Sequence, residues 1–155
     1  MGGRSRIIEL SSSDKTHLFG RHAAQLLPPG SILALHGPLG AGKTSFVQGL
    51  AAGLGITAFI QSPTFTYLHL YEEGVRCLYH FDLYRMKRSS DFFAMGFDEY
   101  FDQNGIVAIE WPERLGAALP SRSISLHFSY SDPGRNVHLS SAFDPDLINS
   151  LAAWD

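Results

Sequence analysis

The first third of the chain joins two apolar runs of strand type to two segments with helical spacing. The run at residues 6–10 predicts a strand, and residues 14–27 carry apolar side chains on one helical face. We expect Asp14 to cap this helix, which ends before "PPG". The run "SILALHG" at residues 31–37 predicts a buried strand, and residues 42–56 predict a second helix that ends at its closing glycines.

Two later segments each have the pattern of paired extended arms around a turn. Residues 62–86 are rich in Thr, Tyr, Leu and Val on both sides of Glu73 and Gly74. Residues 121–142 alternate on both sides of "DPG" at 132–134, which is typical of a hairpin turn. We therefore expect two β-hairpins, one of them near the C-terminus.

Between the hairpins, the pattern predicts a helix, a buried strand and a short helical piece. Ser90 is the expected N-cap of a helix within residues 89–103, and "IVAIE" at residues 106–110 is the strand. Residues 113–120 form at most two helical turns. Strands that are followed by helices predict an α/β fold, with helices flanking a centrally parallel sheet that the hairpins make mixed.

Size and composition are those of one globular domain. The chain has 155 residues, of which 45% are hydrophobic and 17% are charged. That length supports one core, so we expect a single domain over residues 1–155. No apolar window reaches the roughly 20 residues that a membrane helix needs. Residues 1–16 lack an apolar segment of signal-peptide length, so we expect no targeting signal.

Cysteine content and charge restrict the location and the direct partners. Cys77 is the single cysteine, which excludes an internal disulfide and a cysteine-based zinc site and favours a reducing, cytoplasmic location. The formal net charge is −3, so the composition does not indicate autonomous binding to nucleic acid. Arg85, Lys87 and Arg88 form the one local basic cluster, for which a solvated loop is the plain interpretation.

The stretch "GPLGAGKT" at residues 37–44 matches the phosphate-binding pattern G-x-x-x-x-G-K-[ST] position for position. Its glycines let the backbone N–H groups curl around an anion, and the following helix directs its positive end at the same place. Lys43 adds a mobile charge for the β and γ phosphates, and the Thr44 hydroxyl is a ligand for Mg²⁺. The alternative, a glycine-rich turn with a chance lysine, is disfavoured by the strand before it and the helix after it. We expect the nucleotide at Gly37, Leu39, Gly40, Ala41, Gly42, Lys43, Thr44 and Ser45.

Two carboxylates at the ends of predicted strands are candidates for catalysis. Hydrolysis needs a carboxylate that holds the metal ion or orients the attacking water, at the carboxyl end of a strand beside the loop. Glu110 ends "IVAIE", and Asp82 ends "CLYHFD". The alternatives are an exposed strand-end carboxylate for Glu110 and a turn or helix cap for Asp82. His80 lies in the second run, and a lone histidine is more often structural than catalytic.

Two further motifs each leave two interpretations open. The segment "SPTF" at residues 62–65 places the hydroxyls of Ser62 and Thr64 around a proline. It fits either a switch-like loop near the γ-phosphate or the plain start of a strand. The ring of Trp111 belongs either beside the nucleotide or in the core.

The P-loop alone does not name the reaction. A GTPase is excluded, because the chain has no Asn-Lys-x-Asp tetrad to read guanine. The segment "DQNG" at residues 102–105 fits a D-x-x-G spacing, but it precedes an apolar strand instead of following one. A small-molecule kinase stays an alternative, with "YRMKRSSD" as a short candidate lid, and so does a nucleotide-gated binding module.

Four motifs together resemble one family. "GPLGAGKTSF", "SPTF", "HFDLYRM" and "IEWPER", in this order and at these intervals, are similar to the TsaE (YjeE) family of bacterial P-loop ATPases. The resemblance runs from about residue 9 to about residue 140, so this range is the expected core of the domain. It departs from the family pattern mildly, at Pro38 and Met86.

The resemblance implies a role in making N6-threonylcarbamoyladenosine at position 37 of tRNAs that read codons beginning with A. It implies an ATPase that uses ATP and Mg²⁺, is weak alone and acts with the TsaB and TsaD proteins. Contact with tRNA would then be indirect, through the complex, which agrees with the acidic chain. The basic cluster becomes a candidate surface for a partner or for tRNA, beside the plain interpretation as a solvated loop.

The resemblance also implies roles for single residues. Lys43 corresponds to the phosphate residue and Thr44 to a magnesium residue of the family. Glu110 corresponds to the acid at the metal, and Asp82 to a second required carboxylate. Two more residues are expected near the nucleotide on this basis: Thr64 in the switch-like segment, and Trp111.

Overall fold

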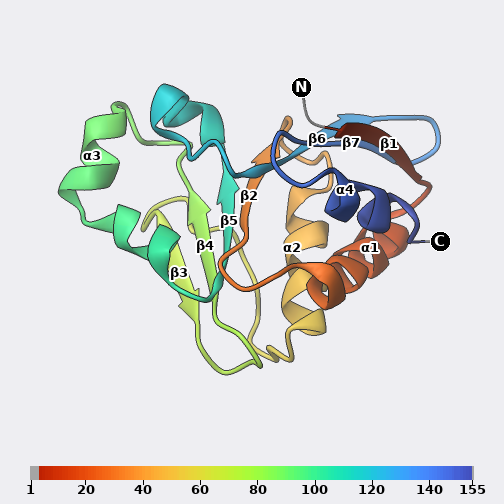
Figure 1. Ribbon diagram of the computed structural model, residues 1–155, viewed down its shortest axis with the longest axis horizontal. Helices are drawn as coiled ribbons and strands as arrows, with labels where there is room; N and C mark the ends of the chain where they lie inside the picture. Colours follow the sequence, from red (N-terminus) through yellow and green to blue (C-terminus); the bar gives the residue numbers. More distant parts are fainter. Residues whose placement is uncertain (1–3, 155) are drawn as a thin grey trace.

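A seven-stranded mixed sheet forms the centre of the molecule (Figure 1). The computed structural model describes residues 4–154. Residues 1–3, which belong to the segment where no targeting signal is expected, and Asp155 lie outside the described residues. The strands are β1 (Arg4–Leu10), β2 (Ile32–His36), β3 (Leu68–Tyr71), β4 (Leu78–Asp82), β5 (Ile106–Glu110), β6 (Ile124–Tyr130) and β7 (Arg135–Ser141).

The order of the strands across the sheet is β1-β7-β6-β2-β5-β4-β3. The four central strands β6, β2, β5 and β4 pair in parallel. β3 is antiparallel to β4, and β7 is antiparallel to both β6 and β1. The predicted fold class, the central parallel strands and both hairpins are therefore confirmed.

Helices cover the two faces of this sheet. They are α1 (Ser13–Leu26), α2 (Lys43–Gly53), α3 (Ser89–Ala94) and α4 (Pro145–Ala152), with three 3-10 turns η1 (Phe97–Asp102), η2 (Pro112–Arg114) and η3 (Gly116–Ala118). No helix within residues 4–154 is both long enough and apolar enough to span a bilayer.

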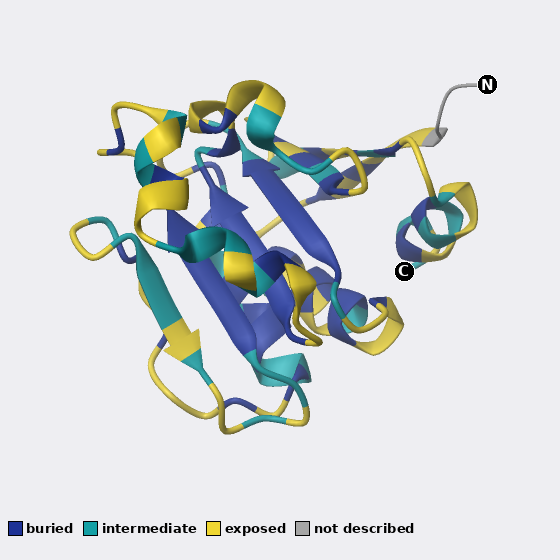
Figure 2. Cartoon of the chain, turned by 60° about the vertical axis from the view of Figure 1, so that its left-hand side comes forward, coloured by how far each residue is buried: buried dark blue, intermediate teal, exposed yellow. Residues whose placement is uncertain are grey.

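Because neighbouring residues of a strand point to opposite faces, β2, β4 and β5 each contribute side chains to two cores. One core lies under α1, α2 and α4 and contains Phe19, Phe46 and Leu50. The other lies under α3 and the 3-10 turns and contains Phe81 and Phe92. β4 and β5 are buried along their whole length, and β2 is buried at all but its last residue. β3 is partly exposed, and β6 and β7 are each exposed on one face (Figure 2).

Glycines allow α1 and α2 to pack closely. A Cβ on Gly20 of α1 would lie 2.3 Å from the carbonyl oxygen of Phe46, and one on Gly49 of α2 would lie 1.9 Å from that of His17. Only a residue without a side chain permits this approach, which brings the start of α2 beside the start of α1. The N-cap of α1 is Ser12, whose hydroxyl accepts from the N–H of Lys15 at 3.2 Å. The prediction of Asp14 as N-cap is wrong, and Asp14 lies in the first turn.

The predicted helix at residues 89–103 is split into two pieces. α3 begins after Arg88, so the prediction of Ser90 as its N-cap is also wrong. Gly96 adopts a left-handed conformation with φ 75°, which ends α3 and starts the 3-10 turn η1. The apolar spacing correctly indicates side chains that face the core, because Phe92 and Phe101 are both buried. These residues belong to two elements, α3 and η1.

The last helix, α4, lies beyond the range for which any element was predicted. Asp144 caps it by accepting from the N–H of Leu147 at 3.0 Å, and Pro145 occupies its first turn. Ile148 and Leu151 are buried against the first core. The tail therefore completes the hydrophobic core beside α1 and β1.

Candidate functional site

The glycine loop connects the carboxyl end of β2 to the first residue of α2. Gly37, Gly40 and Gly42 have φ values of 139°, 77° and 111°, which favour glycine. A Cβ on Gly37 would lie 2.6 Å from the carbonyl oxygen of Phe128 in β6, so the neighbouring strand also requires glycine there. No side chain caps α2, so its first N–H groups are available to an anion. These features fit a phosphate group.

Lys43, the first residue of α2, points back into this loop. Its Nζ donates to the carbonyl oxygen of Gly37 at 2.6 Å and lies 4.6 Å from the ring centroid of Trp111. Burial lowers the pKa of the Lys43 ammonium below its ordinary value, and the charges of Glu110 and Asp82 oppose this shift. A phosphate bound in the loop would favour the charged form further.

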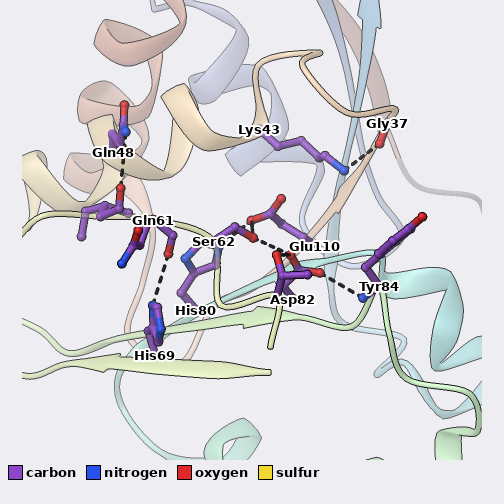
Figure 3. A network of polar contacts seen from close by, with 12 residues as sticks. Gly37, Lys43, Gln48, Gln61, Ser62, His69, His80, Asp82, Tyr84 and Glu110 are labelled. Carbon is purple, nitrogen blue, oxygen red and sulfur yellow. Dashed lines mark hydrogen bonds and ion pairs between the residues drawn. The ribbon is translucent and has the colours of Figure 1, made fainter. Parts of the chain in front are cut away.

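Asp82 and Glu110 lie side by side at the carboxyl ends of β4 and β5. The two residues are paired in the parallel ladder, so their side chains emerge on the same face of the sheet as α2. Each is 4% exposed. The alternative of an exposed strand-end carboxylate for Glu110 is therefore excluded, and both acids face the region of Lys43 (Figure 3).

The "SPTF" loop covers the two acids with hydroxyl groups. Ser62 Oγ lies 2.5 Å from Asp82 Oδ2 and 3.0 Å from Glu110 Oε2, and Thr64 Oγ1 donates to Asp82 Oδ2 at 3.1 Å. Asp82 Oδ1 accepts from the N–H of Tyr84 at 2.9 Å. The Ser62 hydroxyl has one proton for two carboxylates, so the cluster retains acceptor capacity for a cation.

The donor set fits a magnesium ion that arrives with phosphates. Carboxylate and hydroxyl oxygens are the ligands that Mg²⁺ prefers, and it is usually held by one or two carboxylates together with substrate phosphates. Thr44 lies in the first turn of α2, and it lines the same cavity as Glu110. Among residues 4–154, no group of three or more His, Cys, Asp or Glu side chains could hold a metal ion by itself.

A cavity of about 450 Å³ opens above the glycine loop. Seven of the residues predicted for the site line it, namely Leu39, Gly40, Gly42, Lys43, Thr44, Ser45 and Glu110. The other predicted residues, Gly37, Ala41, Thr64, Asp82 and Trp111, are not part of its lining. Of these, Gly37 and Trp111 contact Lys43, and Asp82 is paired with Glu110, so these three lie one contact away from the lining. Thr64 lies one step further out, because it donates to Asp82. Ala41 is fully buried.

The sequence missed the outer wall of the cavity. This wall comes from the start of α1 and from the β6–β7 turn, and it comprises Ser11, Ser12, Ser13, Thr16, Gly134 and Arg135. The strands explain the meeting: β1 runs in the same direction as β6, so its end and the β6–β7 turn lie at the edge where β2 delivers the glycine loop. The segment "SSSD" at residues 11–14 indicates only the start of a helix, so the sequence does not indicate that its residues line a cavity.

The β6–β7 hairpin also clamps the glycine loop. Arg135 donates from Nη2 to the carbonyl oxygen of Gly40 at 2.9 Å, and the Tyr130 hydroxyl donates to the carbonyl oxygen of Leu39. The guanidinium carbon of Arg135 lies 4.8 Å from the ring centroid of Tyr130. Two carbonyls of the loop thus accept hydrogen bonds from the hairpin, which fixes this part of the loop.

The side chain of Trp111 lies between Lys43 and the second core, and its contact with a nucleotide stays a prediction. Its backbone has φ 58° and ψ 48°, a conformation that is strained for a residue with a large side chain. The ring lies over Lys43 and 4.9 Å from the ring centroid of Tyr84, and it packs on the second core. Trp111 is therefore at the site and partly in the core.

The basic cluster touches the loop that covers the acids. The guanidinium carbon of Arg85 lies 4.4 Å from the ring centroid of Phe65, which is 79% exposed. Lys87 and Arg88 are exposed. The cluster is therefore a solvated surface beside the "SPTF" loop.

Comparison with known proteins shows which family the chain matches. A family model described as threonylcarbamoyl adenosine biosynthesis protein TsaE matches residues 10–137. The chain belongs to the TsaE family. This confirms the resemblance drawn from the four motifs.

Curated TsaE proteins are similar over most of the chain. The tRNA threonylcarbamoyladenosine biosynthesis protein TsaE of Bacillus subtilis is 42% identical over 73% of this chain and 70% of its own length. The TsaE proteins of Treponema pallidum and of Synechocystis are 44% and 48% identical, over 78% and 73% of this chain and 88% and 73% of their own lengths. The crystal structure of Bacillus subtilis YdiB matches with a TM-score of 0.85 and 30% identity, covering 98% of this chain and 97% of that one.

Proposed function

We propose that the chain is the ATP-binding and ATP-hydrolysing subunit required to form N6-threonylcarbamoyladenosine at position 37 of tRNAs that read codons beginning with A. Membership of the TsaE family supports the pathway. One observation carries the ATPase activity: Lys43 and two buried carboxylates, Asp82 and Glu110, converge at the edge of the sheet where the glycine loop begins α2.

In this proposal, the phosphates lie between the glycine loop and the two acids. Lys43 exchanges the carbonyl of Gly37 for the β and γ phosphate oxygens, and the first N–H groups of α2 bind the same groups. Thr44 and Glu110 would hold Mg²⁺, which neutralises charge on the phosphate oxygens when bound. The ribose and base would lie against the outer wall, where Ser12 and Arg135 offer polar contacts.

Asp82 has a different role from Glu110 in the proposal. Its two oxygens hold Ser62, Thr64 and the N–H of Tyr84, and it is absent from the cavity lining. Asp82 therefore controls the "SPTF" loop and, once Ser62 moves aside, accepts a hydrogen bond from the attacking water. Because Ser62 and Thr64 cover the acids in this structure, the isolated protein should hydrolyse ATP slowly.

We further propose that the TsaB and TsaD proteins are the partners, and that tRNA is reached through their complex. The net charge of −3 supports indirect contact with RNA, because proteins that bind RNA directly usually carry an excess of Lys and Arg for the phosphates. A pathway that acts on tRNA and the single cysteine support a cytoplasmic location.

The test is Mg²⁺-dependent ATP hydrolysis by the purified protein, alone and mixed with the TsaB and TsaD proteins of the same organism. We expect little turnover alone, stimulation on mixing, and loss of stimulation in the Glu110→Ala variant. Strong phosphorylation of a small metabolite without partners would instead favour a kinase. Full support of tRNA modification by both Glu110→Ala and Asp82→Ala proteins that bind ATP would favour a nucleotide-gated binding module.

A further inference from the structure

A buried histidine contacts the acid that is proposed to hold the metal ion. His80 is 0% exposed, and its Nε2 lies 2.7 Å from Oε2 of Glu110 (Figure 3). An ionised carboxylate can only accept a hydrogen bond, so the proton must be on Nε2. The contact therefore links the imidazole to one oxygen of the carboxylate.

The sheet register explains how the ring reaches this acid. His80 is paired with Ala108, and Asp82 is paired with Glu110, in the parallel ladder of β4 and β5. Alternate residues of a strand share a face, so all four side chains emerge on the side of α2. The methyl group of Ala108 leaves room for the imidazole to lean across the ladder to Glu110.

Packing alone does not account for a histidine at this position. Its second nitrogen, Nδ1, is buried and has no hydrogen-bond partner among the described residues. A buried polar atom without a partner disfavours folding, and an apolar side chain would avoid that penalty. The benefit of His80 must therefore lie in its one polar contact, the contact with Glu110.

The two oxygens of Glu110 differ in their surroundings. Within residues 4–154, the hydrogen bonds to its carboxylate come from His80 and Ser62, and both fall on Oε2. Glu110 also lines the cavity above the glycine loop. With Oε2 held from behind, Oε1 is the oxygen left to bind a ligand from the cavity.

We propose that His80 is a positioning residue, which anchors Oε2 of Glu110 and thereby directs Oε1 at the metal ion bound with the nucleotide. The inference rests on the proposed function, because it assumes that Glu110 holds that ion. Ser62 sits on a loop that the proposed function requires to move, whereas His80 sits inside the central strand β4. His80 is thus the anchor that persists when the loop opens.

Four variants test this role. His80→Leu removes the donor, His80→Gln keeps an amide N–H at about the place of Nε2, and His80→Asn has an amide too short to reach Glu110. Leu78→Ala is the matched control for packing, because Leu78 is a fully buried residue on the same face of β4. Binding of a non-hydrolysable ATP analogue is measured by fluorescence in EDTA and in Mg²⁺, and Mn²⁺ binding to that complex by electron paramagnetic resonance.

We expect His80→Leu and His80→Asn to weaken Mn²⁺ binding by roughly 10- to 100-fold, the usual effect of losing a group that orients a metal ligand. Their affinity for the analogue in EDTA should stay within about twofold of wild type, and His80→Gln should keep most of the Mn²⁺ affinity. The Leu78→Ala variant should unfold more easily but bind Mn²⁺ normally. If His80→Leu does not fold, the Mn²⁺ affinities of His80→Gln and His80→Asn test the proposal instead.

Three results would overturn the proposal. The first is unchanged Mn²⁺ binding in His80→Leu and His80→Asn. The second is a loss of affinity for the ATP analogue in EDTA as large as the loss of Mn²⁺ affinity. The third is a His80→Gln protein that binds Mn²⁺ as weakly as His80→Asn. A double-mutant cycle sharpens the test, since replacement of His80 should have no further effect in a Glu110→Gln background. If wild type binds no metal–nucleotide complex, the proposed function fails first. The ¹⁵N spectrum of the imidazole then still shows whether Nε2 carries the proton and senses Glu110→Gln.

Discussion

The strands β2, β5 and β4 carry the chemical groups of the site, whereas β6, β7 and β1 shape its outer wall. The first set delivers the glycine loop, Glu110 and Asp82 directly from the carboxyl ends of parallel strands. The second set reaches the same edge through a hairpin turn and the start of a helix, and it contributes Arg135 and Ser12. Strand ends thus place the reactive groups, while connections between other strands complete the cavity.

The largest effect should follow from a change in the first set. Glu110→Gln removes the charge that the metal ion needs, so partner-stimulated ATP turnover should fall by about 100-fold or more, as for loss of a positioned catalytic group. Turnover is measured with and without the partner proteins. The control is Glu113→Gln, an exposed acid three residues further along. Equal losses in the two variants would contradict the assignment of Glu110.

A second change in the first set should weaken nucleotide binding. Lys43→Ala removes a charge-assisted contact to phosphate, so the affinity for ATP should fall by roughly 1.5–3 kcal/mol. Calorimetric titration measures this, with the exposed Lys87→Ala as the control. An ATP affinity equal to that of wild type would contradict the assignment of the loop.

A change in the second set should have a smaller effect on the same measurement. Arg135→Ala removes the hydrogen bonds that fix the Gly40 carbonyl of the glycine loop, so ATP affinity should fall by about 1 kcal/mol. The matched control is Arg122→Ala, because Arg122 also binds backbone carbonyls, those of Gly30 and Phe101, but does not line this cavity. A loss in Arg135→Ala as large as that in Lys43→Ala would mean that the hairpin does more than shape the wall.

The smallest effect concerns stability and comes from histidines at the junction of the two sets. The rings of His36 and His127 stack at 4.1 Å between centroids, at the pairing of β2 with β6. Burial is the main cause that lowers the pKa of each below 6.5, and a neighbouring histidine adds to it in both cases. The unfolded chain therefore binds protons first as the pH falls below 6.5, and stability should decrease there.

Thermal unfolding at pH 7.5 and pH 5.5 checks this expectation. The fall in the free energy of unfolding due to these rings should be less than about 1 kcal/mol, because solvent screens them. His127→Gln should reduce the fall and leave the stability at pH 7.5 nearly unchanged. The same fall in this variant as in wild type would exclude the stacked pair as its source.

Much of the fold followed from patterns that are local in sequence. The buried runs of β2 and β5, the helix after the glycine loop and both hairpins were predicted, because each pattern reports which side chains face the core. The N-cap of α1 was misplaced by two residues, since Ser12 and Asp14 are both good capping residues and only the backbone decides between them. The split of residues 89–103 at Gly96 was missed, because the apolar spacing continues across the break.

For the site, the sequence by itself determined the groups that a short segment can specify. It placed a phosphate loop between a strand and a helix, and it placed Asp82 and Glu110 at strand ends, because strand pattern and loop chemistry are written in neighbouring residues. The tertiary structure alone decided which distant residues meet. The outer wall with Arg135, the cover by Ser62 and the contact of His80 with Glu110 all depend on strand order and register. Those are set by the packing of the whole chain, so no single segment could reveal them.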